Sequence, residues 1–113
     1  MIKTINGIER DGKLYFNCRI FGGVYMYVDY VKGAETSYKL SFAVRDMKNL
    51  AGGFYNLIDD GALYEIELLT GKNVVSLPVP ESADELEVTL TPTGTPDAST
   101  LVKIYVNGDI IGG

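Results

Sequence analysis

The chain has 113 residues, of which 46% are hydrophobic and 22% are charged, and its formal net charge is −5. This length and composition predict one globular domain over residues 1–113, large enough to bury about two-thirds of the surface that its unfolded form exposes. The acidic charge makes nucleic acid and anionic membranes poor partners, and a single cysteine excludes an intramolecular disulfide.

The N-terminal stretch MIKTINGIERDGK has no basic segment followed by an apolar run. No segment of the chain reaches the roughly 20 apolar residues that a membrane helix needs. We therefore expect a protein that is made in the cytoplasm and not exported, which leaves open a final location on a particle assembled there.

Turn signals divide the chain into short segments. The dipeptides Asp11-Gly12 and Asn107-Gly108 tolerate the positive φ values of a tight hairpin turn. Between the turns, polar and apolar residues alternate with the period of two that a half-buried strand requires. The expected strands cover residues 13–21, 24–32, 37–45, 62–69, 74–79, 84–91 and 100–106.

Residues 45–53 are the one segment that resembles a helix. Asp46 can cap a single turn there, and Gly52 and Gly53 would end it. We expect a loop or one turn, followed by a strand near residues 54–58.

Pro78 and Pro80 flank Val79 near the end of an expected strand. A proline cannot donate a hydrogen bond to a strand ladder, so this strand should end there or lie at a sheet edge. Taken together, the elements predict an all-β fold, an antiparallel two-sheet β-sandwich that is jelly-roll-like and has seven or eight strands.

One face of each expected strand is apolar. A register slip of one residue would expose a whole set of these side chains, so the alternation indicates a core. Tyr30 and Tyr38 fall on this inward face. The side chains that we expect to be buried together are Phe16, Phe42, Ile66, Val88 and Ile104.

The residue types of common catalytic sites are scarce. The chain has no histidine and no tryptophan, which removes Ser-His and Cys-His pairs and the preferred ligand of most transition metals. Cys18 shares the inward face with Leu14 and Phe16, so we expect a small buried hydrophobic residue and not a reactive thiol. The sequence predicts no enzyme, no catalytic residue and no cofactor.

Three pairs of carboxylates are the candidates for a catalytic or metal site. Glu65 and Glu67 point the same way on a strand, as in the Glu-x-Asp-x-x-Glu strand of jelly-roll glucanases. This chain lacks the third carboxylate and the tryptophans of that pattern, so both residues are expected to be solvated. The pairs Asp59-Asp60 and Asp84-Glu85 could hold calcium, but they lack the spacing of a dedicated loop, and turn chemistry explains them.

Tyrosines gather on the outward faces of the expected strands. If 13–21 pairs with 24–32, they form one exposed aromatic patch, and such a patch usually marks a binding surface. The alternative is that other parts of the fold cover them. The predicted interface residues are Tyr15, Tyr25, Tyr27 and Tyr105, and Phe21 also points outward.

A strand that ends in Tyr-x-Lys-Gly, followed by Glu-Thr-Ser and an alternating strand with Phe, resembles small β-sandwich structural proteins of tailed bacteriophages. The stretch LPVPESADELEVTLTPTGTPDASTLVKIYV is similar to the ending of the same group, so the likeness covers residues 24–106, and it departs at RDMKNLAGGFYNLI. The matching residues are Tyr30, Lys32, Gly33, Glu35, Thr36, Ser37 and Phe42.

This resemblance implies a virion component, assembled in the host cytoplasm, that binds other virion proteins and copies of itself. It implies capsid decoration, or a connector or tail role, without catalysis. A second resemblance competes with it, because STLVKIYVNGDIIG looks like the Asn-Gly hairpin of concanavalin-like lectin modules. That alternative implies a glycan as the partner, bound in a concave pocket with polar and aromatic walls.

Overall fold

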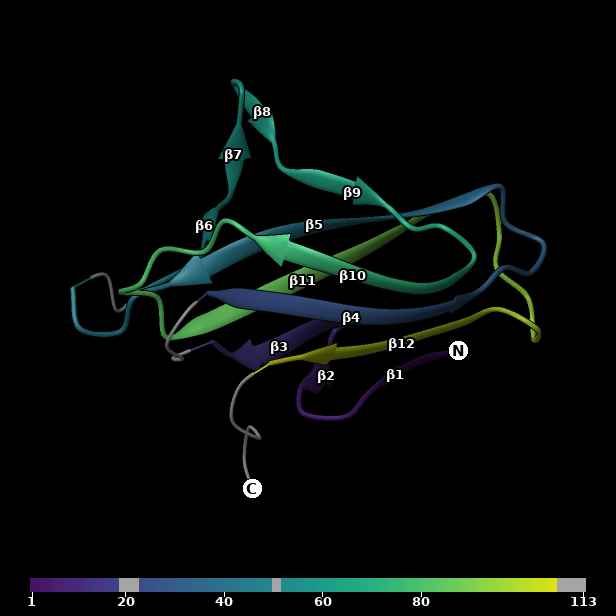
Figure 1. Cartoon of the computed structure of the whole chain (residues 1–113), viewed down its shortest axis with the longest axis horizontal. Helices are drawn as coiled ribbons and strands as arrows, with labels where there is room; N and C mark the ends of the chain where they lie inside the picture. The colour runs from purple at the N-terminus through teal and green to yellow at the C-terminus, as the bar shows by residue number, and fades with distance from the viewer. Residues whose placement is uncertain (19–22, 50–51, 108–113) are drawn as a thin grey trace.

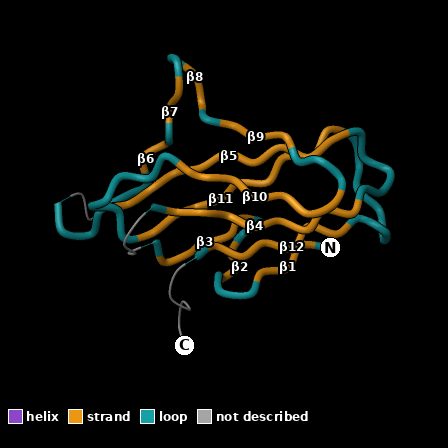
Figure 2. The backbone as a smooth tube through the Cα atoms, viewed as in Figure 1, coloured by secondary structure: helices purple, strands orange, loops and turns teal. Residues whose placement is uncertain are grey.

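The structure is a computed structural model that describes residues 1–18, 23–49 and 52–107. These residues form strands, turns and loops and contain no helix (Figures 1 and 2). Accordingly, no helix in this part of the chain could cross a membrane. The strands are β1 (Ile2–Thr4), β2 (Ile8–Arg10), β3 (Lys13–Asn17), β4 (Val24–Val31), β5 (Ser37–Arg45), β6 (Tyr55–Asn56), β7 (Ile58–Asp59), β8 (Ala62–Leu63), β9 (Glu65–Glu67), β10 (Gly71–Leu77), β11 (Glu85–Thr93) and β12 (Leu101–Val106).

The strands are arranged in two main sheets and one small hairpin. A four-stranded sheet has the order β1-β12-β4-β10, and a six-stranded sheet has the order β2-β3-β11-β5-β6, with β9 also paired to β5. The four-stranded sheet lies in front in Figure 1, and the hairpin β7-β8 projects from the top of the molecule. All pairings are antiparallel except that of β1 with β12. The prediction of an all-β fold with antiparallel sheets is confirmed.

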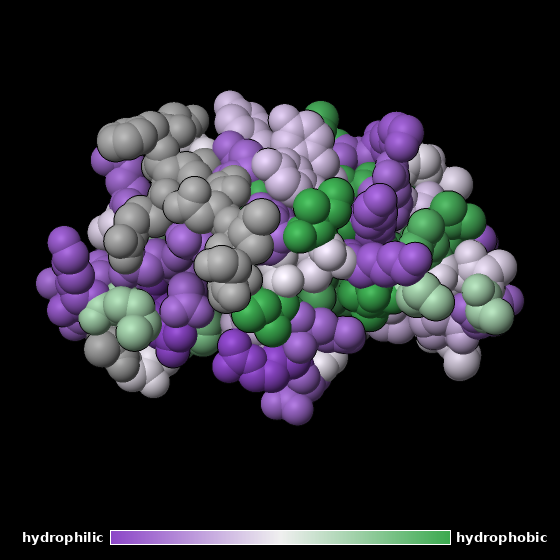
Figure 3. All heavy atoms as spheres, turned by 90° about the horizontal axis from the view of Figure 1, so that it is seen from below, coloured by the Kyte–Doolittle hydropathy of each residue, from purple (hydrophilic) through white to green (hydrophobic). Residues whose placement is uncertain are grey.

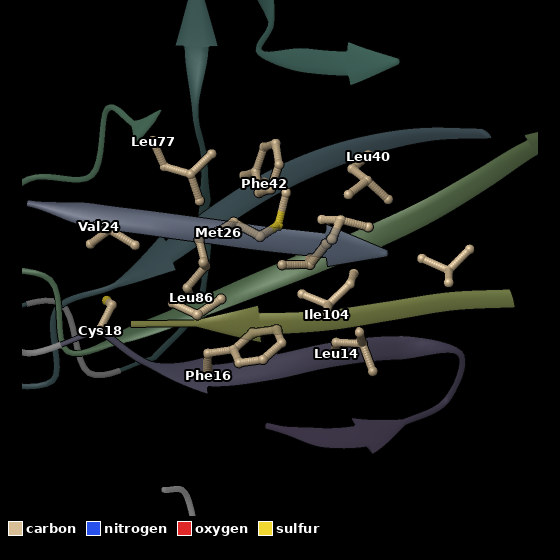
Figure 4. Packing of buried hydrophobic residues seen from close by; sticks show 14 of the residues in the cluster. Leu14, Phe16, Cys18, Val24, Met26, Leu40, Phe42, Leu77, Leu86 and Ile104 are labelled. Carbon is tan, nitrogen blue, oxygen red and sulfur yellow. The ribbon is translucent and has the colours of Figure 1, made fainter. Parts of the chain in front are cut away.

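The predicted alternation sets the two faces of each long strand. Inward-pointing side chains from both main sheets form one core cluster (Figure 4). Four of the five predicted core residues are at most 2% exposed, namely Phe16, Phe42, Val88 and Ile104. Ile66 is only half-buried against the core, because β9 lies outside β5 at the edge of its sheet. Tyr30 and Tyr38 are buried as expected.

The predicted Asp11-Gly12 hairpin is confirmed. It joins β2 to β3, and the φ angles of Asp11 and Gly12 are 53° and 79°, in the left-handed region that such a turn requires. The other predicted hairpin contains Gly108, which lies outside the described residues.

Asp46 caps a turn over residues 46–49, as the sequence predicts. Its Oδ1 accepts hydrogen bonds from the backbone N–H groups of Lys48 at 3.0 Å and Asn49 at 3.2 Å. The proline prediction is also confirmed, because β10 ends at Leu77, directly before Pro78, and forms an outer strand of its sheet.

The described residues form twelve strand segments where the sequence predicts seven or eight strands, and half of these segments have two or three residues. The expected strands at 54–58 and 62–69 are each divided into two short pieces, β6 with β7 and β8 with β9. The breaks release β7 and β8 from the six-stranded sheet, so that they pair only with each other.

The segment between β1 and β2 crosses from one main sheet to the other. Asn6 is buried there, its Oδ1 accepts a 3.2 Å hydrogen bond from the Val106 N–H, and its amide donates to the Val106 carbonyl. Gly7 follows, and a Cβ at that position would lie 2.6 Å from the Phe16 ring. The crossing therefore depends on the Asn6 amide, which hydrogen-bonds to Val106 as a neighbouring strand would, and on the absence of a side chain at Gly7.

Candidate functional site

Exposed large hydrophobic side chains gather in two places among the described residues. One group lies on or beside the outer face of the four-stranded sheet, and the other lies on and next to the β7-β8 hairpin. From the side where β1 and β2 lie, hydrophobic atoms reach the surface in separate patches among hydrophilic ones (Figure 3). The first group is Ile5, Tyr25, Tyr27, Val31 and Val74, and the second is Tyr55, Ile58 and Leu63.

An aromatic row crosses the outer face of the four-stranded sheet. It consists of Val74, Tyr27 and Tyr105, which are direct cross-strand partners on β10, β4 and β12. The rings of Tyr27 and Tyr105 are 5.9 Å apart between centroids and tilted by 46°, a favourable arrangement of two aromatic rings. Tyr27 is 49% exposed and Tyr25, two residues earlier, is 40% exposed. The row is thus preorganised by the sheet and still open to a partner.

A charged row runs beside the aromatic row and has one residue from each strand of the sheet. It consists of Lys72, Asp29, Lys103 and Lys3, aligned by the strand registers. Lys72 Nζ lies 2.9 Å from Asp29 Oδ1, and an exposed pair of this kind contributes at most about 1 kcal/mol to stability. Three lysines against one aspartate give this face a basic stripe on an otherwise acidic protein.

The two rows border a shallow depression of about 260 Å³. Ile5, Tyr27 and Tyr105 contribute apolar and aromatic walls, and Asp29, Lys72 and Lys103 contribute charged ones. Ligand pockets usually enclose about 300 Å³ or more. The depression therefore suits a few projecting side chains or one sugar ring better than an enclosed small molecule.

Tyr15 does not belong to this face, so the predicted contiguous patch with Tyr25 and Tyr27 is wrong. Strands β3 and β4 do not pair, because β3 lies between β2 and β11 in the other main sheet, and β4 lies between β12 and β10. Tyr25, Tyr27 and Tyr105 point away from the core, as predicted, and the pairing of β12 with β4 places them on one face. Phe21 lies outside the described residues.

The Tyr15 side chain is engaged within the molecule. Its hydroxyl donates a 3.0 Å hydrogen bond to Glu87 Oε2, and its ring packs 5.5 Å from Phe54 and beneath the guanidinium of Arg10 at 4.7 Å. Burial and the hydrogen bond with Glu87 raise the pKa of Tyr15. That Tyr15 takes part in an interface remains a prediction. Such an interface would be distinct from the aromatic row, because Tyr15 lies in the other main sheet.

A buried carboxylate, Glu35, was not singled out as a site from the sequence. It is fully buried where the loop after β4 meets the loop before β12, and it accepts hydrogen bonds from the Tyr30 hydroxyl, the Gly33 N–H and the Thr100 hydroxyl. Burial opposes ionisation, but the hydrogen bonds from Thr100 and Tyr30 outweigh it and lower the pKa of Glu35 to about 2. Because every donor is internal, Glu35 ties two loops together and presents nothing to a ligand.

Cys18 occupies the position that the sequence predicts. It is 4% exposed, and its thiol donates to the Ala83 carbonyl at 3.6 Å. Burial raises the pKa of the Cys18 thiol to about 12. The thiolate is the reactive form of cysteine, so this environment makes the thiol unreactive.

The predicted carboxylate pairs lie apart from the aromatic row. Glu65 and Glu67 are exposed on β9, and Asp59 and Asp60 are exposed at the tip of the β7-β8 hairpin. In the third pair, Asp84 accepts the Met47 N–H at 2.8 Å and Glu85 pairs with Arg45 at 2.7 Å. No group of three or more potential metal ligands occurs within residues 1–18, 23–49 and 52–107.

No protein family, curated protein or solved structure matches this chain. The outer face of the four-stranded sheet is therefore judged on its own chemistry. Its exposed tyrosines, Tyr25 and Tyr27, are of a residue type that is enriched at protein interfaces, whereas its lysines are of a type that is depleted there.

Proposed function

We propose that the protein is a non-catalytic structural component of a phage-like particle, which binds other particle proteins and copies of itself. The observation that carries this proposal is the aromatic row of Val74, Tyr27 and Tyr105. Tyrosine is enriched at protein interfaces because it combines a large apolar body with a polar tip. Because three paired strands hold the row, its side chains lose little conformational entropy on binding, so even a contact of small area can give a favourable binding free energy.

A jelly-roll fold fits the order of the strands. The set β1-β12-β4-β10 packs across one core from the set β3-β11-β5-β9, and the six longest strands alternate between the two sheets along the chain. Such interleaving is expected when a double sheet is wound from two Greek keys, whereas the parallel pair β1-β12 departs from it. Jelly rolls serve in viral capsids and in lectins, so the fold agrees with the proposed function and with its alternative.

The resemblance to phage proteins supports the fold more than the binding surface. Three of its matching residues, Tyr30, Gly33 and Glu35, are joined by hydrogen bonds in the buried carboxylate cluster. These residues hold a loop in place. The functional part of the proposal rests on the exposed face, where a particle protein that is repeated by symmetry gains avidity from several weak contacts.

The test combines assembly state with location. Sizing of the purified protein should show association, and imaging of the source particle should place the protein on the capsid, connector or tail. The double variant Tyr27→Ser with Tyr105→Ser should weaken binding to the particle at least about tenfold, which is a modest loss for two interface tyrosines. A matched control is Leu69→Ser, because Leu69 is 71% exposed and lies between β9 and β10, outside the strands of the face.

One observation favours the lectin-like alternative. The depression combines the rings of Tyr27 and Tyr105 with the polar groups of Asp29, Lys72 and Lys103, and a sugar site needs both kinds of wall. A protein that stays monomeric, ignores particles and binds a glycan array through these residues would replace the proposed function with this one.

A further inference from the structure

The β7-β8 hairpin forms an arm, residues 58–63, that stands apart from both main sheets (Figure 1). Its base is fixed, because the Leu57 N–H donates to the Phe42 carbonyl at 2.9 Å and the Tyr64 N–H donates to the Leu57 carbonyl at 2.8 Å. The Tyr64 ring also packs 5.8 Å from the Phe42 ring. The arm is thus anchored in the core at its base, and all six of its residues are exposed.

The arm carries an apolar pair and an acidic tip. Ile58 and Leu63 are cross-strand partners, and they are 59% and 46% exposed. Asp59 and Asp60 follow at the turn, and no lysine or arginine occurs between residues 54 and 71. An isolated two-stranded hairpin is marginally stable in water and gains stability when it packs against another element. We therefore expect another surface to cover the exposed apolar pair of the arm.

The outer face of the four-stranded sheet has the complementary chemistry. Its depression has apolar walls from Ile5, Tyr27 and Tyr105. Its charged wall has two lysines, Lys72 and Lys103, against one acid, Asp29, which pairs with Lys72 at 2.9 Å and leaves a net positive charge. Figure 1 shows this sheet in front, whereas the arm leaves the molecule at its upper edge. The exposure of both surfaces shows that an arm does not cover the face of its own molecule. In a second copy of the chain, the face offers apolar and basic groups to the arm of the first copy, and the arm offers apolar and acidic groups to the face of the first copy.

We propose that the arm of one copy docks on the outer face of the four-stranded sheet of the next copy. Ile58 and Leu63 pack against Tyr27, Tyr105 and Ile5. Asp59 and Asp60 meet Lys72 and Lys103. This inference rests on the proposed function, because it requires copies of the chain to associate.

The contact is head-to-tail, since it joins two different surfaces. Such contacts close into rings when the rotation between copies allows it, and otherwise extend into open arrays. In a head-to-tail contact, a copy with a defective arm can still bind a copy with a defective face, because the remaining arm and the remaining face are both intact. In a face-to-face dimer, a copy with a defective face has no such rescue.

The first experiment measures association by sedimentation velocity of the full chain over a range of concentrations and salt. The arm variant is Ile58→Ser with Leu63→Ser, the face variant is Tyr27→Ser with Tyr105→Ser, and the control is Leu69→Ser. Each of the first two variants should associate at least about tenfold more weakly than the parent chain, and the control should behave like the parent. Unfolding curves similar to that of the parent verify that each variant is folded.

Mixing the arm variant with the face variant is the decisive step. The intact arm of the face variant should dock on the intact face of the arm variant and give a one-to-one complex, because no further intact pair of surfaces remains. An arm variant that associates like the parent, or a mixture that forms no complex, overturns the arm inference. If the face variant alone is defective, the proposed interface on the aromatic row still stands.

Charge reversal checks the polar half of the contact. Asp59→Lys with Asp60→Asn should weaken association, and so should Lys72→Glu with Lys103→Glu, while one chain with all four changes should regain it. Asparagine is chosen at position 60 because Asp60 has a φ of 52°, which asparagine tolerates. A four-change chain that stays dissociated contradicts the proposed charge pairing. A parent chain that is monomeric at every concentration overturns the arm contact, and its absence from particles as well would refute the proposed function.

Discussion

Thr100 Oγ1 donates a 2.6 Å hydrogen bond to Glu35 Oε1 across 65 residues of sequence. The same carboxylate accepts the Tyr30 hydroxyl and the Gly33 N–H. Gly33 is required there because a Cβ would lie 2.3 Å from the Thr100 hydroxyl oxygen. One buried acid thus connects the end of β4 with the start of β12.

Replacement of Glu35 by alanine should be strongly destabilising, because it leaves the buried Tyr30 and Thr100 hydroxyls without their acceptor. We expect the thermal unfolding midpoint to fall by roughly 10 °C, measured by circular dichroism. Glu35→Gln keeps the shape and one acceptor oxygen and should lose less. The exposed Glu9→Ala is the control, and an equal midpoint for both alanine variants would contradict the structural role of Glu35.

Stability should decrease on acidification below about pH 4.5. The folded state holds the pKa of Glu35 at about 2, below its ordinary value of 4.5, so the unfolded chain binds the proton first. The stabilising contribution of ionised Glu35 is complete above about pH 4.5 and is lost as the pH falls towards 2. Urea unfolding at pH 6, 4.5, 3 and 2 should show a shallower decline in Glu35→Gln than in the parent chain. Parallel declines would show that other carboxylates dominate.

Phe42→Ala should cost about 3–5 kcal/mol of unfolding free energy, the usual loss for a phenylalanine in a packed core. Phe42 is 2% exposed and touches the Tyr64 ring at the base of the arm. Ile66→Ala should cost less than about 2 kcal/mol, because Ile66 is already partly exposed at the sheet edge. Denaturant titration gives the unfolding free energy of both variants. A larger loss for Ile66→Ala than for Phe42→Ala would contradict the placement of Phe42 in the core and of Ile66 at the sheet edge.

Asn6→Ala should cost about 1–3 kcal/mol, because both backbone groups of Val106 lose a buried partner. Amide hydrogen exchange at Val106 should accelerate at the same time. Asn56→Ala, at an exposed position, is the control. Unchanged exchange at Val106 in the Asn6 variant would argue against this hydrogen-bond pair.

Glycoside hydrolysis should be undetectable in the parent chain. Glu65 and Glu67 are exposed on an edge strand and project beside Ser41 and Lys39. Assays with a panel of glucans, run beside Glu65→Gln with Glu67→Gln, test this expectation. Activity that disappears in the double variant would make these carboxylates the functional site.

Local patterns in the sequence predict local features of this fold. The alternation around Phe16, Met26 and Val88 places the correct side chains inward, because side-chain direction follows the strand period alone. The left-handed turn at Asp11-Gly12 has the same local origin. Pairing partners are not local, so the sequence does not determine the neighbour of β3. The patch of Tyr15 with Tyr25 and Tyr27 depended on a pairing of β3 with β4 that the fold does not contain.

The candidate face was predicted in part for the same reason. Tyr25, Tyr27 and Tyr105 point outward by alternation, but their neighbours Lys72 and Val74 join them only through the pairing of β10 with β4. Glu35 lies in the polar segment KGAETS, which has the composition of an exposed turn. Its burial depends on Thr100, which only the folded chain brings into contact.

The order of the strands also bears on how the protein is made. Strands β3 and β5 are joined only through β11, and β1 reaches β4 only through β12. A nascent chain that has emerged from the ribosome as far as β10 therefore has strands for both sheets but lacks the two that connect them. Until residues 85–106 are released, only β4-β10 and the short local pairs can form, and the apolar faces stay exposed. Folding of this domain should consequently await the release of residues 85–106, because distant strand pairings form slowly and an unfinished chain exposes its apolar surface until then.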